Sequence, residues 1–126
     1  MSPTVRAILL AEAGRYDEAA DAFAVAADHL EESTERGPYP ARSARKASRR
    51  MRALAWASRL FPDLELGPRH VTDVRDLGGE QRRFQVQIGP RGWIEVLVRD
   101  GTSGLRVTGG TPSVVSEARS RARRIR

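Results

Sequence analysis

The sequence predicts an α+β fold, with helices in the first half of the chain and an antiparallel sheet in most of the second half. Up to residue 61, apolar residues recur every three to four positions, which is the spacing of amphipathic helices. From residue 81 they alternate with polar residues, as in half-buried strands. We expect an N-terminal helical hairpin, a long third helix, a three- or four-stranded antiparallel meander and a C-terminal helix.

Length and composition bound the class of protein. At 126 residues the chain is predicted to form a single domain, with a helical part over 1–61 and a sheet plus C-terminal helix over 70–126. The absence of cysteine excludes disulfides and thiolate metal sites. No apolar run is long enough to span a membrane, and the first residues lack the pattern of a signal peptide. A cytoplasmic protein is therefore expected.

Three helices are predicted in the first half of the chain. Residues 3–13 have apolar side chains at helical spacing, and Gly14 ends this helix. Residues 16–35 carry alanines and aromatic residues on one face and acids on the other. Prolines and a glycine in the following linker keep the third helix from starting before about residue 41, and Pro62 ends it after residue 61.

Small and aromatic residues at fixed spacing mark the N-terminal hairpin. They are Gly14, Tyr16, Ala19, Phe23 and Ala26. In this pattern, residues 1–33 resemble a tetratricopeptide helical hairpin, a family that implies binding to other proteins. An ordinary αα-hairpin is the alternative interpretation. No second copy follows, and such repeats stabilise one another in about three copies. We therefore expect the hairpin to pack against the third helix or against another chain.

The second half of the chain is predicted to form strands. Residues 81–88, 92–99 and 105–109 alternate clearly, whereas residues 70–77 alternate poorly. The C-terminal helix is expected to begin at Thr111–Pro112, with the threonine at the N-cap and the proline in the first turn.

The first tight hairpin has a predicted register. An odd loop, or a bulge at Gly92, places Val86 opposite Ile94 and keeps both apolar sets on one face of the sheet. A slip of one residue would turn every side chain of a strand to the wrong face. Burial therefore favours the odd loop.

Charge is distributed unevenly along the chain. Residues 1–35 carry eight acids and two bases, residues 36–61 carry eight bases and no acid, and residues 111–126 carry five bases and one acid. Arginine accounts for 21 of the 22 basic residues. Its planar, forked donors suit phosphate and carboxylate groups, although a GC-rich genome also produces such a bias.

The predicted third helix carries these arginines on one face, which we call the arginine stripe. Its members are Arg42, Arg45, Arg49, Arg52, Trp56 and Arg59. The stripe has three interpretations. In the first, the arginines meet phosphates while Trp56 stacks on a base. In the second, they meet the carboxylates of a protein partner or of residues 16–35. In the third, they form a solvated face that covers apolar surface. Trp56 is alternatively part of an apolar seam beneath another element.

Two further sets of residues are candidate interaction sites. Trp93 and Leu97 point away from the expected apolar face of the sheet, where they either cover a second helix or form an exposed interface. Arg119, Arg123 and Arg126 form a secondary basic face on the C-terminal helix.

The sequence predicts no catalytic, metal or cofactor site and no small-molecule substrate. His29 and His70 are its two histidines, and no nucleophile is identifiable for them. The glycines form no phosphate-binding or dinucleotide-binding motif. We expect a non-enzymatic adaptor that binds a protein partner, or a second copy of itself, through its helical part and basic helix face. The alternative is a nucleic-acid-binding regulatory or phage-type accessory protein that uses the arginine stripe.

Overall fold

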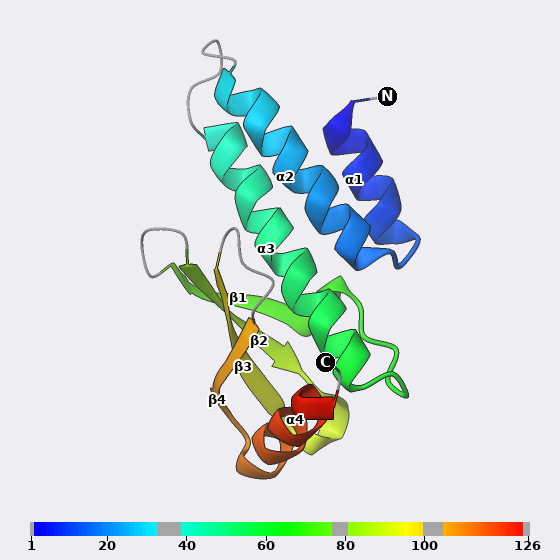
Figure 1. The fold of residues 1–126 in the computed structure, drawn as a ribbon, viewed down its shortest axis with the longest axis vertical. Helices are drawn as coiled ribbons and strands as arrows, with labels where there is room; N and C mark the ends of the chain where they lie inside the picture. Colours follow the sequence, from blue (N-terminus) through cyan, green and yellow to red (C-terminus); the bar gives the residue numbers. More distant parts are fainter. Residues whose placement is uncertain (1, 33–38, 77–80, 100–104, 125–126) are drawn as a thin grey trace. The chain divides into compact units, whose positions relative to one another are not determined.

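The computed structural model has the predicted α+β class (Figure 1). It describes residues 2–32, 39–76, 81–99 and 105–124. The described chain forms two compact units, Met1–Arg52 and Ala53–Arg126, whose boundary falls inside the third helix. The expectation that residues 1–126 form a single domain stays a prediction.

Four α-helices are present in the described residues. They are α1 (Pro3–Glu12), α2 (Tyr16–Glu32), α3 (Tyr39–Leu60) and α4 (Pro112–Arg124). The third starts two residues earlier than predicted. Pro40 is accommodated in its first turn, because the N–H that proline lacks has no partner within the helix at that position. The end of the predicted helix over 16–35 lies outside the described residues.

A glycine turn joins α1 to α2 in the first unit. Gly14 has a φ of +78°, a left-handed conformation that favours glycine. The N–H of Arg15 then donates to the carbonyl of Leu10 at 2.9 Å, which satisfies the end of α1. The beginning of α1 is capped by the hydroxyl of Ser2, which accepts from the N–H of Val5 at 3.2 Å.

Small side chains line the contact between α2 and the first part of α3. Ala26, Ala27 and Ala44 form a buried cluster, with Leu30 packed against it. Because alanines let two helix backbones approach closely, a side chain of α3 reaches the backbone of α2. The buried hydroxyl of Ser48 donates to the carbonyl of Ala20 at 2.7 Å.

The second unit contains one antiparallel sheet in the order β1–β2–β3–β4. The strands are β1 (Val71–Asp76), β2 (Gln81–Gln87), β3 (Trp93–Arg99) and β4 (Leu105–Gly110). A bulge in β1 between Asp73 and Arg75 explains why residues 70–77 alternate poorly in the sequence. Arg82 holds this edge strand to β2, because its guanidinium donates to both carboxylate oxygens of Asp73, one of them at 2.7 Å.

The register of β2 and β3 confirms the odd loop. Val86 pairs with Ile94, and five residues separate the two strands. Within this connection Gly92 has a φ of +134°, and a Cβ built there would lie 2.2 Å from the Thr111 hydroxyl oxygen. Glycine is therefore required both by the backbone conformation and by the approach of the chain that leads into α4.

The core of the second unit lies on one face of the sheet. Val114, Val115 and Ala118 of α4 are buried, and this helix packs against β3 and β4 (Figure 1). Thr111, the residue before α4, is hydrogen-bonded to β3. Its N–H donates to the carbonyl of Trp93 at 2.9 Å, and its hydroxyl oxygen accepts from the N–H of Trp93 at 3.2 Å.

Candidate interaction surfaces

Two members of the arginine stripe pair with acids of α2. Arg45 Nη2 lies 3.1 Å from Asp28 Oδ1, and Arg52 Nη2 lies 2.7 Å from Asp21 Oδ1. The Ser48 hydrogen bond to α2 comes between them along α3. We call this set of contacts the polar seam. It supports the interpretation in which the acids that meet Arg45 and Arg52 belong to the chain itself.

The other members of the stripe have different surroundings. Arg42 is exposed near the start of α3, whereas Arg49 and Arg59 both take part in interactions with other groups. Trp56 is half-buried and belongs to the second unit. Within the stripe, Arg45 and Arg52 are thus ion-paired with carboxylates of the chain itself.

The ion pairs of the polar seam are expected to contribute modestly to stability. About one third of each arginine side chain and about two thirds of each aspartate side chain are exposed, so solvent screens both pairs. In a double-mutant cycle with Arg52→Ala and Asp21→Ala, we expect a coupling free energy of about 0.2–1 kcal/mol that falls as salt increases. Denaturant unfolding of the four proteins at two salt concentrations measures it. A salt-independent coupling well above this range would contradict the screened geometry.

Exposed apolar side chains gather on the first unit. Among the described residues, the large apolar side chains that are exposed are Val5, Ile8, Leu9 and Val25, each between 45% and 49% accessible. Three of them follow the spacing i, i+3, i+4 on α1 and form one stripe, while Ala7 is the buried residue of that helix. Helix α1 therefore carries apolar residues both toward α2 and away from it.

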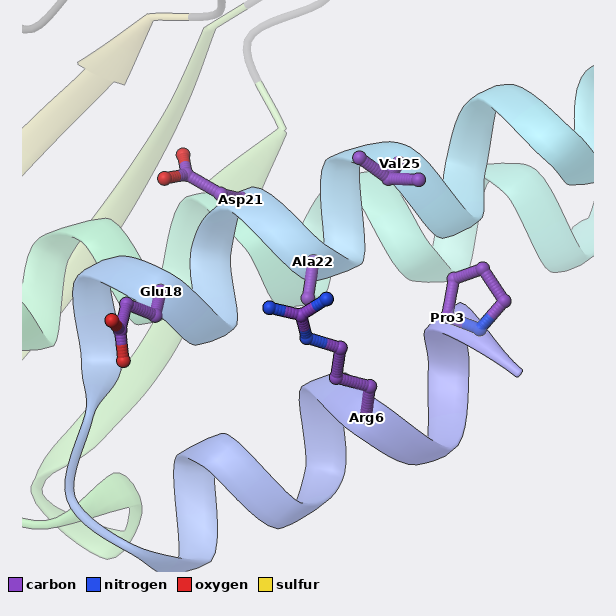
Figure 2. A pocket seen from close by; sticks show the side chains of 6 residues that line it. All are labelled: Pro3, Arg6, Glu18, Asp21, Ala22 and Val25. Carbon is purple, nitrogen blue, oxygen red and sulfur yellow. The ribbon is translucent and has the colours of Figure 1, made fainter. Parts of the chain in front are cut away.

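A groove of about 320 Å³ lies between α1 and α2. Figure 2 shows Arg6 reaching from α1 toward Ala22 of α2, with Pro3 and Val25 at one side and the carboxylates of Glu18 and Asp21 at the other. The groove thus combines an apolar side with ionised groups of both signs. Sequence reasoning missed this surface because the apolar residues of α1 explain a helix equally well whichever face is buried.

The predicted sites of the second unit differ in how exposed they are. Trp93 is half-buried, and Leu97 is 8% exposed between Arg83 and Arg106 of the neighbouring strands, on the sheet face opposite Phe84. Arg119 and Arg123 are exposed on α4. Arg126 lies outside the described residues.

The two histidines lie in separate units. His29 is exposed on α2, whereas His70 accepts the N–H of Gly67 through Nδ1 at 2.9 Å and thereby shapes the turn before β1. Among the described residues, no group of three His, Cys, Asp or Glu side chains is placed to hold a metal ion. Within the same residues, no helix has the length and apolar character needed to cross a membrane.

Comparisons with protein-family models, with curated proteins and with solved structures found no match to this chain. The resemblance of residues 1–33 to a tetratricopeptide hairpin therefore stays a prediction.

Proposed function

We propose that this protein is a non-enzymatic interaction module that binds a protein partner through α1 and the groove between α1 and α2. The observation that carries the proposal is the apolar stripe of Val5, Ile8 and Leu9, which lies exposed on a helix whose opposite face is already packed. Exposed apolar residues that form a contiguous group mark interaction sites more often than scattered ones do.

The surroundings of the stripe suit a protein partner. An interface between proteins typically has an apolar centre and a polar rim. Here Pro3 and Val25 adjoin Arg6, Glu18 and Asp21 around the groove. The stripe of Val5, Ile8 and Leu9 lies on the helix that supplies Pro3 and Arg6. The spacing i, i+3, i+4 is also the pattern by which a helix presents its side chains to an apolar partner surface.

The polar seam has a supporting role in this proposal. It holds α2 to the first part of α3 through Arg45, Arg52 and Ser48, so that α2 offers a fixed wall to the groove. In this role Arg45 and Arg52 act within the chain, through the carboxylates that they meet on α2. A preorganised surface loses less conformational entropy when its partner binds.

The proposal is tested by photo-crosslinking in cells with a photoreactive residue at position 8. We expect a discrete covalent adduct, whose mass shows whether the partner is another protein or a second copy of this chain. A probe at Glu65, which is exposed in the second unit, serves as the reference position. The adduct should be lost when Val5 and Leu9 are replaced by serine, because these changes remove most of the remaining apolar stripe.

A matched control leaves the apolar stripe intact. Thr4→Ser and Glu12→Gln change exposed polar residues of α1 and should preserve the adduct. The proposal is wrong if position 8 gives no more adduct than position 65, or if the serine variant crosslinks as efficiently as the unmodified stripe.

A further inference from the structure

One face of α4 carries two arginines and two serines beside a hollow of about 420 Å³. The residues that line the hollow are Pro112, Val115, Ser116, Arg119, Ser120 and Arg123. They are spaced by three or four positions and therefore share a single helix face. With a rise of about 1.5 Å per residue, the two arginines are separated by about 6 Å along the helix axis.

The acidic residue of α4, Glu117, forms its ion pairs away from this face. Glu117 pairs with Arg91 and with Arg121. Arg121 also donates to the carbonyl of Leu60 at 2.8 Å and lies 5.0 Å from the centre of the Phe61 ring. Arg121 and Glu117 thus have structural partners, and Glu117 is the single acid in residues 105–124, which contain five arginines. The charge of Arg119 and Arg123 is not offset by α4 or β4.

Arg119 is held in place by the sheet. Its Nη2 donates to the carbonyl of Val107 at 3.2 Å, and the guanidinium retains further donors. A guanidinium that is already oriented loses less rotamer freedom when it binds an oxyanion. The hydroxyls of Ser116 and Ser120 add neutral donors along the same face.

We propose that this face of α4 binds the phosphate backbone of duplex nucleic acid. Arginine and serine side chains are typical phosphate donors, and contacts of this kind position a protein without reading sequence. The described lining of the hollow contains no aromatic residue, so it offers no platform on which unpaired bases stack. A duplex is favoured over an acidic protein because its closely spaced phosphates release condensed counterions on binding.

The test is fluorescence anisotropy of the full chain with a labelled 20-base-pair DNA duplex at ~50 and ~200 mM salt. We expect binding that weakens with salt, and a loss of about tenfold in affinity at the lower salt for Arg119→Gln with Arg123→Gln. The slope of log affinity against log salt should fall in magnitude by about 2, because two phosphate contacts are removed. Circular dichroism melting verifies that the variant is folded.

A matched control removes the same charge elsewhere in the second unit. Arg69 and Arg99 are exposed, and Arg69→Gln with Arg99→Gln should change the affinity by less than about twofold, since neither residue lines the hollow. Three results would overturn the proposal: no binding by the wild type, equal losses in the two double variants, or polyglutamate competing as well as unlabelled duplex. The crosslinking at position 8 is independent of all three.

Discussion

Phe84→Ala should lower the free energy of unfolding of the second unit by about 3–5 kcal/mol. Phe84 is fully buried in β2, an interior strand, where it pairs with Val96 of β3. Removing the ring loses its transfer free energy and leaves a cavity, because strands that are hydrogen-bonded on both sides do not collapse into the space. Denaturant unfolding of the full chain, followed by a signal from the sheet, measures the change.

The reference for this prediction is an exposed residue of the same sheet. Thr72→Ala in β1 should change the stability by no more than about 0.5 kcal/mol, because it removes neither buried apolar volume nor a special backbone conformation. A loss of less than about 1.5 kcal/mol for Phe84→Ala would place the phenylalanine ring outside a well-packed core.

Gly110→Ala should destabilise the second unit by about 3 kcal/mol, near the upper end of the range for a strained backbone position. Gly110 has a φ of +132°, which L side chains rarely adopt. A Cβ there would also lie 2.3 Å from the carbonyl oxygen of Trp93 and 2.7 Å from the Cα of Ile94. Both atoms belong to the backbone of β3, so a side-chain rotation cannot relieve the contact, and the β3–β4 pairing must shift.

A substitution at Gly89 measures the cost of conformational strain without the steric contact. It also has a positive φ, +55°, but a Cβ at this position meets no atom within 4 Å. Gly89→Ala should therefore cost only about 1 kcal/mol, the penalty for a left-handed alanine. Thermal or denaturant unfolding compares the two variants. Equal losses would show that the approach of β3 to Gly110 contributes nothing.

The proposals give the two units different kinds of partner. The first unit offers exposed apolar residues on α1, while the second offers the exposed Arg119 and Arg123 beside the hollow on α4. Since protein and phosphate partners respond differently to salt, the two binding activities are separable by experiment. Serine variants at Val5 and Leu9 should leave duplex binding unchanged, and glutamine variants at Arg119 and Arg123 should leave the crosslink at position 8 unchanged.

Local patterns in the sequence were sufficient for much of the fold. The period of apolar residues located the helices and the three clear strands, and the burial of Val86 with Ile94 determined the loop between β2 and β3. The poorly alternating strand β1 could be predicted only weakly, because its bulge is a feature of its pairing with β2.

The candidate sites depended much more on which elements pack together. From the sequence, the arginine stripe was compatible with phosphates, with acids of the chain or with solvent, and the structure pairs Arg45 and Arg52 with acids of α2. Likewise, helical spacing predicted α1 without deciding that Val5, Ile8 and Leu9 are exposed while Ala7 is buried.

The sequence by itself therefore determined the class, the order of the elements and the surplus of arginine on α3 and α4. These properties follow from local conformational preference and from the periodicity of apolar residues along the chain. The tertiary structure alone decided which arginines are ion-paired and which apolar face of α1 stays exposed. The physical reason is that neutralisation of a charge and burial of a side chain both require a neighbour brought near by the fold, and such a neighbour can be distant in the sequence.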